Sequence, residues 1–215
     1  MKCSDCSENI QPVVCIDIDG TLAQYHNTFA RFLEEYLPCE DLPRDWDGHG
    51  EFSDHLEVDK HQYRQAKLAF RAGGFKRWMP PFSGATKFMH GLQSMGLEIW
   101  VTTTRPWQRM DSVDPDTKEW LRRNGIPYRR LLFDDEKYTR ICELIDPKRV
   151  VMVLDDEIDH AEKCQDLGLP FVLFGTEWNN DVHEDFTGFP RVDGYEEATK
   201  LAEERIGIGH ALQLF

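Results

Sequence analysis

Two aspartates, Asp17 and Asp19, stand at the end of the first apolar run of this chain, residues 13–18, and Gly20 follows them directly. A run of this length, rich in valine and isoleucine and closed by a glycine, predicts a buried strand. In an open α/β sheet, ligands bind at the carboxyl ends of the strands, where these acids would lie. Because two buried carboxylates so close together are costly without a cation, the run predicts a Mg²⁺ site.

Apolar runs alternate with amphipathic segments along the 215 residues of the chain. The runs cover residues 13–18, 97–102, 131–133, 150–154 and 171–174. Between them, residues 85–92 and 117–124 have a helical pattern, and glycines follow at Gly96 and Gly125. This alternation predicts an α/β fold, a Rossmann-like parallel sheet with helices on both faces.

The segment between the first two predicted strands is longer than a simple crossover requires. Residues 29–37 and 63–70 carry aromatic and aliphatic side chains at helical spacing, and Pro80 and Pro81 close the segment. We therefore expect residues 23–81 to form a small helical cap inserted after the first strand. Residues 1–22 and 82–215 would then form the α/β core.

Polar signals also follow the later strands. Thr103 ends the second strand, Lys137 opens a helix after the third, and Asp155 and Asp156 end the fourth. A hydroxyl can donate to a phosphate oxygen, and a lysine adds one positive charge. Together with the first acid pair, these residues predict a metal-assisted phosphoryl-transfer site.

Each signal has a purely structural alternative. An Asp-x-Asp-Gly sequence often forms a turn through a side-chain hydrogen bond, and threonines are common at strand ends. The second acid pair could cap the following helix, and Lys137 could be a solvated helix residue. All four signals in this order favour the chemical interpretation.

In this order the motifs resemble those of the haloacid dehalogenase superfamily of phosphotransferases, over residues 13 to about 175. The resemblance implies that Asp17 attacks phosphorus and forms an aspartyl-phosphate. Asp19 would protonate the leaving oxygen and later activate water. Thr103, helped by Thr104, would bind a phosphoryl oxygen, and Lys137 would stabilise the charge on phosphate and nucleophile.

The same resemblance implies a Mg²⁺ ion bound by Asp17, by the backbone carbonyl of Asp19, and by the pair Asp155 and Asp156. Which member of that pair contacts the ion directly stays open.

Three segments, residues 19–25, 75–85 and 117–121, are similar to the 5'(3')-deoxyribonucleotidases and related nucleotidases. This similarity implies a nucleoside monophosphate as substrate, with the base held between Tyr25 and Phe70. The alternative is that Phe70 and Trp78 belong to the cap's own core. Aromatic stacking binds a flat base without reading its edges.

The sequence departs from that family at two places near the site. Thr21 replaces its usual valine, and Thr104 and Arg105 replace a Ser-Pro pair. Thr104 and Arg105 are candidate substrate contacts, although for Arg105 a surface ion pair is the favoured alternative.

Two other functions remain open from the sequence. One is a polynucleotide 3'-phosphatase, which shares these motifs and an arginine after the second one. The other is a phosphate- or nucleotide-binding module without turnover. The expected long cap disfavours the first, and the complete set of acids disfavours the second.

The formal charge of −14 and the scattered basic residues argue against a stable nucleic-acid partner. No apolar stretch approaches the length that a bilayer needs, and we expect a cytoplasmic protein with no membrane partner.

The cysteine spacing predicts reduced thiols. Cys3 and Cys6 could be half of a zinc site or part of a tail, and the C-terminal residues 211–215 could pack on the core or on a second copy in a homodimer.

Overall fold

The computed structural model describes residues 11–37, 59–179 and 188–212. Its strands are β1 (Val13–Asp17), β2 (Glu98–Thr103), β3 (Arg130–Phe133), β4 (Val150–Asp155), β5 (Phe171–Phe174) and β6 (Arg191–Val192). They form one sheet in the order β3-β2-β1-β4-β5-β6, and every neighbouring pair is parallel. The predicted parallel sheet is confirmed, and its five predicted strands agree with β1 to β5 to within one residue at each end.

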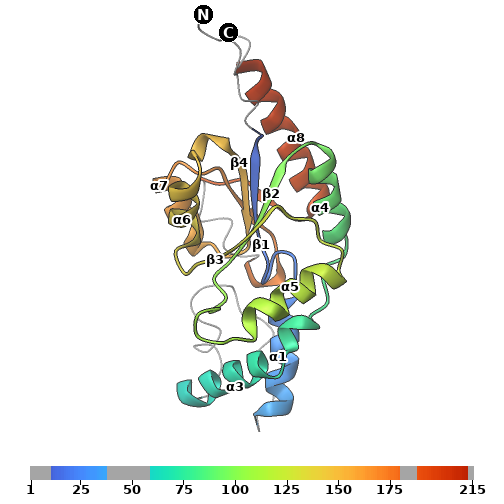
Figure 1. The fold of residues 1–215 in the computed structure, drawn as a ribbon, viewed down its shortest axis with the longest axis vertical. Helices are drawn as coiled ribbons and strands as arrows, with labels where there is room; N and C mark the ends of the chain where they lie inside the picture. The colour runs from blue at the N-terminus through green and yellow to red at the C-terminus, as the bar shows by residue number, and fades with distance from the viewer. Residues whose placement is uncertain (1–10, 38–58, 180–187, 213–215) are drawn as a thin grey trace, which may run out of the picture.

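Helices follow nearly every strand. They are α1 (Tyr25–Tyr36), α3 (Lys60–Ala72), α4 (Ala85–Ser94), α5 (Val113–Arg123), α6 (Lys137–Leu144), α7 (Asp159–Asp166) and α8 (Tyr195–Leu212), with short 3₁₀ turns η1 (Phe75–Arg77), η2 (Pro147–Arg149) and η3 (Glu177–Asn179). Figure 1 shows α6 and α7 on one side of the sheet and α4 and α8 on the other.

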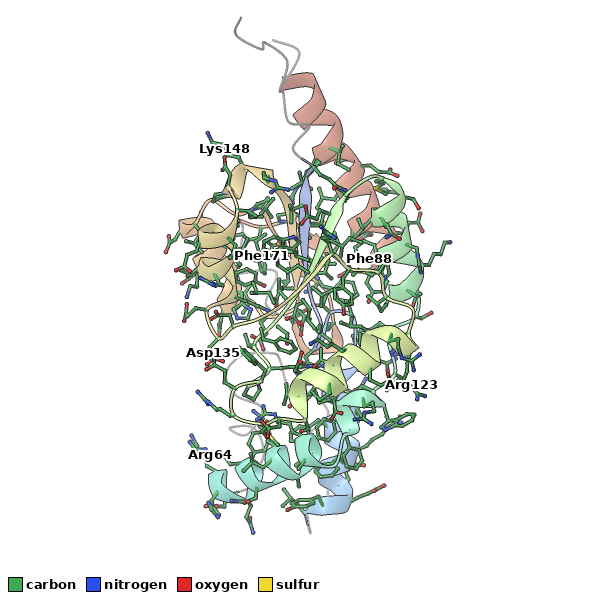
Figure 2. All side chains as sticks on the ribbon, in the orientation of Figure 1. Arg64, Phe88, Arg123, Asp135, Lys148 and Phe171 are labelled. Carbon is green, nitrogen blue, oxygen red and sulfur yellow. The ribbon has the colours of Figure 1, made fainter. Side chains whose placement is uncertain are left out.

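The central strand β1 separates two apolar cores. Val14 and Ile16 belong to the core under α4, α5 and α8, whereas Val13 and Cys15 belong to the core under α6 and α7. Successive side chains of a strand point to opposite faces, so an uninterrupted apolar run is needed where both faces are covered. The predicted arrangement of helices on both faces is therefore confirmed. Figure 2 shows the side chains that fill the space between the sheet and these helices.

Because all strands run in one direction, their carboxyl ends share one edge of the sheet. Asp17 pairs with Thr102 in register, and Thr103 pairs with Phe133 on the next strand. This register brings the residues after β1, β2, β3 and β4 to the same edge, which is where ligands bind in open α/β sheets.

Between β1 and α4, the chain forms α1, α3 and η1 around an aromatic cluster that includes Phe29, Tyr63 and Phe70. Figure 1 shows α1 and α3 beyond the end of the sheet, near α5. These buried residues belong to the same apolar cluster as Val14 and Ile16. The division into a core and a cap of residues 23–81 stays a prediction.

Two features differ from the sequence reading. The two-residue strand β6 was not predicted, because so short a segment has no detectable alternation. Gly207 and Gly209 also predict an interruption of the C-terminal helical pattern that starts near Tyr195. This prediction is wrong, because α8 continues through both glycines. A glycine inside a helix costs only about 1 kcal/mol relative to alanine, which a long helix can tolerate.

The described cysteines, Cys15, Cys142 and Cys164, carry free thiols. Cys3 and Cys6 lie outside the described residues, as do residues 213–215. Within the described ranges, none of the helices has the length and apolar composition required to span a bilayer.

Candidate active site

A buried ion pair joins the ends of β1, β4 and the first turn of α6. Nζ of Lys137 lies 2.5 Å from Oδ1 of Asp17 and 2.6 Å from Oδ2 of Asp155. Burial acts to lower the pKa of Lys137, but the two carboxylates outweigh it and raise that pKa above its usual value. Lys137 is therefore a fixed positive charge beside Asp17, placed there because the helix begins at this residue.

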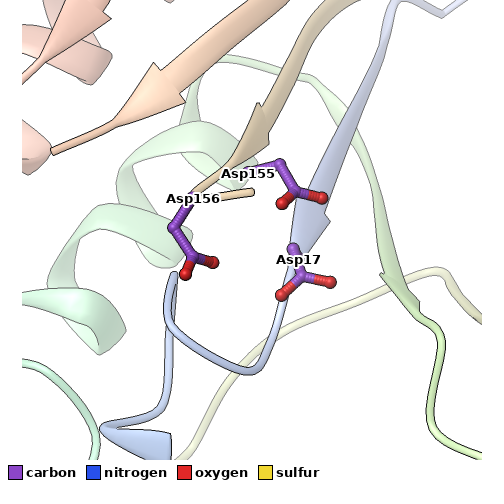
Figure 3. A group of neighbouring side chains, drawn as sticks. All are labelled: Asp17, Asp155 and Asp156. Atoms are coloured by element: carbon purple, nitrogen blue, oxygen red, sulfur yellow. The ribbon is translucent and has the colours of Figure 1, made fainter. Parts of the chain in front are cut away.

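Three carboxylates converge at the same point. Asp17, Asp155 and Asp156 are buried, and each offers an oxygen within 4.8 Å of the others. Figure 3 shows the three carboxylates gathered at the ends of β1 and β4. Burial, together with repulsion from Asp155, raises the pKa of Asp17 to about 7, although Lys137 opposes the shift.

The turn after β1 leaves room for Asp156 because residue 20 is glycine. Gly20 has a φ of +98°, and a Cβ at this position would lie 2.0 Å from Oδ2 of Asp156. The hydroxyl of Thr21 donates to Oδ1 of Asp156 across 3.0 Å. The first acid motif and the last are thus fitted to each other, and Gly20 is required both for its backbone conformation and for the close approach.

Asp155 and Asp156 have different surroundings. Asp155 accepts hydrogen bonds from Lys137, from the Tyr138 hydroxyl and from the backbone N–H of Glu157, and Nδ1 of His160 lies 3.2 Å from its Oδ2. Burial acts to raise the pKa of Asp155, but Lys137 and His160 hold it well below its usual range. The carboxylate of Asp155 therefore holds these donor groups in place.

Asp156 has one side-chain donor among the described contacts, Thr21. Burial and the neighbouring carboxylates of Asp155 and Asp17 raise the pKa of Asp156 well above its usual value. Three buried carboxylates facing one ammonium leave an excess of negative charge that a cation would balance. Hard oxygen donors of this kind fit Mg²⁺, and of the second acid pair Asp156 has more oxygen lone pairs left for it.

Thr103 ends β2 and is buried, and its hydroxyl oxygen accepts the backbone N–H of Arg105 at 3.3 Å. The neighbouring Thr104 is partly exposed. The register of the sheet places Thr103 on the strand next to Asp17. A phosphoryl group bound at Asp17 would therefore lie within reach of this strand end.

The side chain of Asp19 lies between two cations. Arg105 donates through Nε at 2.9 Å and through Nη2 at 2.5 Å, and Lys76 donates to the same carboxylate. Burial acts to raise the pKa of Asp19, but Arg105 and Lys76 outweigh it and hold the pKa far below its ordinary value.

Arg105 does not form the surface ion pair considered from the sequence. It is buried, and Nη1 also donates to Thr117 at 2.9 Å. Lys76 was not recognised as a site residue at all. It belongs to residues 75–85, where the chain is similar to nucleotidases, but no local pattern distinguishes a buried lysine from a solvated one.

The two aromatic side chains expected to hold a base, Tyr25 and Phe70, contact each other. Their ring centroids lie 6.1 Å apart with the rings nearly perpendicular, and Phe70 is 1% exposed. Nζ of Lys76 lies over the Tyr25 ring, 4.0 Å from its centroid. Trp78, by contrast, is 61% exposed and packs beneath Arg123. In this arrangement the first two rings do not face each other across a gap, and the base clamp stays a prediction.

Comparisons with known proteins agree with this geometry. The model of the family described as 5' nucleotidase, deoxy (pyrimidine), cytosolic type C protein matches residues 11–206. A candidate 5'(3')-deoxyribonucleotidase from Chlorobaculum tepidum is 23% identical over 179 residues, which cover 80% of this chain and 83% of that protein.

Solved structures share the fold at low sequence identity. A haloacid dehalogenase-like hydrolase from Streptococcus pneumoniae has a TM-score of 0.64 at 13% identity, with 88% of this chain and 97% of that chain covered. A protein described as a predicted phosphatase from Clostridium acetobutylicum has a TM-score of 0.68 at 15% identity, with 90% and 99% covered. The fold, the match over residues 11–206 and the acid cluster at the strand ends lead to one conclusion. The chain belongs to the cytosolic type C 5'-nucleotidase family, a family of haloacid dehalogenase-type phosphatases.

Proposed function

We propose that this enzyme hydrolyses nucleoside monophosphates in the cytoplasm, with Mg²⁺ as cofactor and with an aspartyl-phosphate on Asp17 as intermediate. The observation that carries the proposal is the contact of Lys137 with both Asp17 and Asp155 beside the third carboxylate, Asp156. The family match supports the nucleotide as substrate.

In the first step an oxygen of Asp17 attacks phosphorus, and the bond from phosphorus to the ester oxygen breaks. Asp19 turns away from Lys76 and Arg105, takes a proton from solvent and gives that proton to the leaving oxygen. Lys137 stabilises the negative charge that Asp17 and the phosphoryl group share, and the Thr103 hydroxyl donates to a phosphoryl oxygen, with Thr104 beside it. The position of Asp17 and Thr103 at the ends of adjacent strands supports these roles.

In the second step a water molecule attacks phosphorus and gives a proton to Asp19. The bond between Asp17 and phosphorus breaks and phosphate leaves. Asp19 then releases its proton to solvent as it pairs again with Lys76 and Arg105, which restores the starting state. Asp17, Asp155 and Asp156, with the backbone carbonyl of Asp19, would hold the Mg²⁺ ion. When bound, the ion would neutralise charge on the carboxylates and the phosphoryl group.

The experiment is a phosphate-release assay over nucleoside 5'- and 3'-monophosphates, sugar phosphates and 3'-phosphorylated oligonucleotides, with and without Mg²⁺. We expect the highest kcat/KM on a nucleoside monophosphate. After chelation of Mg²⁺ we expect no phosphate release. The Lys137→Met variant should lose turnover, whereas Lys118→Met, which changes an exposed lysine of α5, should keep it. Turnover of the oligonucleotides alone would contradict the proposal.

A further inference from the structure

Two buried cations beside Asp19 take no part in the proposed steps. Lys76 is 5% exposed and Arg105 3% exposed, although lysine and arginine are almost never buried without a paired anion. Lys76 comes from η1, between α3 and α4, and Arg105 comes from the loop after β2. Both donate to the carboxylate of Asp19. In their described contacts, the two cations thus share one negative charge, the carboxylate of Asp19.

Two neighbouring described acids are paired with other cations. Asp116 accepts from Arg77, and Asp17 accepts from Lys137. The positive charge around Asp19 is therefore not balanced by either of these carboxylates.

The Tyr25 ring is part of the same arrangement. The Phe29 ring stacks on it at a centroid distance of 5.6 Å and an interplanar angle of 5°, and the ammonium of Lys76 lies 4.0 Å from its centroid. A base that stacked on Tyr25 would have to displace one of these groups. Beside the Tyr25 ring, a ligand would therefore meet the positive charge of Lys76.

Asp19 cannot serve its proposed role while both cations hold it. To reach the leaving oxygen, its carboxyl group has to turn away from Lys76 and Arg105. Those cations would then be buried without an anion, which is strongly unfavourable. An anionic group of the substrate, separate from the phosphate that is cleaved, would remove this penalty because it would replace Asp19 as their partner.

We propose that Lys76 and Arg105 bind a second anionic group of the substrate, a phosphate or a carboxylate close to the ester that is cleaved. This inference rests on the proposed function, since it names the substrate class within it: a phosphomonoester with a second negative group, such as a nucleoside 3',5'-bisphosphate. Arg105 suits this role because its fork binds phosphate and carboxylate in the same bidentate way.

The test is calorimetric binding to the Asp17→Asn chain in Mg²⁺, where bound ligands are not turned over. One pair of probes is thymidine 3',5'-bisphosphate and thymidine 5'-monophosphate. The other pair is 3-phosphoglycerate and glycerol 3-phosphate, which differ by one carboxylate. We expect the doubly anionic member of at least one pair to bind about tenfold more tightly or better, as a new charge-assisted hydrogen bond would give. The pair that shows the preference identifies the second group as phosphate or carboxylate.

The preference should depend on the charge of residue 76. Added to the same Asp17→Asn chain, Lys76→Met should abolish it, Lys76→Arg should retain it, and Lys118→Met, which changes an exposed lysine, should leave it unchanged. A thermal melt of each variant checks folding. If Lys76→Met is unfolded, the comparison of the probe pairs in the Asp17→Asn chain still tests whether a second anionic group is bound.

Affinities equal to within about twofold in both pairs, or a preference that survives in folded Lys76→Met, would overturn the inference. Phosphate release by the unmodified enzyme tests the proposed function separately. An enzyme that hydrolyses thymidine 5'-monophosphate but shows no preference between the probes keeps the proposed function and loses this inference. A chain that prefers the doubly anionic probe but does not hydrolyse thymidine 5'-monophosphate keeps this inference and loses the proposed function.

Discussion

The guanidinium of Arg105 holds the carboxylate of Asp19 with two hydrogen bonds, one from Nε at 2.9 Å and one from Nη2 at 2.5 Å. The two residues are 86 positions apart in the sequence. Both side chains lie at the carboxyl edge of the sheet, and that of Arg105 is 1% exposed. This contact stabilises the ionised carboxylate of Asp19, so Asp19 has to leave Arg105 and take up a proton before it can act as the proposed acid.

Removing the Arg105 charge should destabilise the fold. Arg105→Leu leaves Asp19 paired with Lys76 alone, and breaking a buried ion pair costs about 3 kcal/mol. Urea unfolding at pH 7 measures the loss. Arg109→Leu is the matched control, because the ion pair of Arg109 with Asp135 is exposed on both sides and such pairs contribute no more than about 1 kcal/mol. Equal effects of the two substitutions would mean that the Asp19 contact adds nothing to stability.

Asp17→Asn should lower turnover roughly a thousandfold or more, because an amide cannot attack phosphorus. The substitution removes one negative charge from a buried group of three carboxylates, so the fold should remain intact in a thermal melt. Chelation should stop the unmodified enzyme to a similar extent. Undiminished turnover by the variant would exclude an aspartyl-phosphate at this position.

The strands and the acids at their ends could be predicted from the sequence because both signals are local. An apolar run and the polar residues that end it are adjacent in the chain, and a parallel sheet brings all such ends to one edge. Gly20 also belongs to this local pattern, although its close approach to Asp156 depends on the register between β1 and β4.

The cations around Asp19 could not be predicted in the same way. Lys76 and Arg105 are 57 and 86 residues from Asp19 in the sequence, and nothing near either residue shows that it is buried. The role of Phe70 was ambiguous for another reason. An aromatic residue at helical spacing has the same pattern whether it packs in a core or contacts a ligand.

Asp19→Asn should lower kcat on a nucleoside monophosphate by about a hundredfold to ten-thousandfold, the usual contribution of a general acid. The loss should be smaller on p-nitrophenyl phosphate, because nitrophenolate leaves with little need for a proton. Steady-state kinetics on both substrates measures the difference. The same loss on both would contradict the acid role of Asp19 and favour a purely structural one.

The stability of the fold should fall in mild acid because of His26. Burial lowers the pKa of His26 to about 4, and Lys76 and Lys67 add to this effect while Asp19 opposes it. In the unfolded chain a histidine has a pKa of about 6.5, so below this pH the unfolded state binds more protons. The contribution of neutral His26 is complete above pH 6.5 and is lost progressively toward pH 4, by no more than about 3 kcal/mol.

Urea midpoints of the unmodified chain and His26→Gln between pH 7.5 and 4.5 test this expectation. The variant should have the flatter profile, because glutamine does not titrate. His90→Gln, which changes an exposed histidine of α4, should leave the profile unchanged. Parallel profiles for the unmodified chain and His26→Gln would show that His26 titrates alike in the folded and unfolded states.

Phe70→Ala should act mainly on stability. The Phe70 ring is 1% exposed, and the rings of Tyr25, Phe29, Phe32 and Phe75 lie with centroids 5.2 to 6.1 Å from its own. Truncating such a phenylalanine costs about 3–5 kcal/mol, which calorimetry would record as a lower Tm.

The base clamp implied by the family resemblance predicts a further effect, a loss of roughly 1–3 kcal/mol in nucleotide recognition for Tyr25→Ala and for Phe70→Ala. From the packing of these rings we expect folded variants to lose equally on a nucleotide and on a baseless phosphate, and a loss confined to the nucleotide would establish the clamp instead.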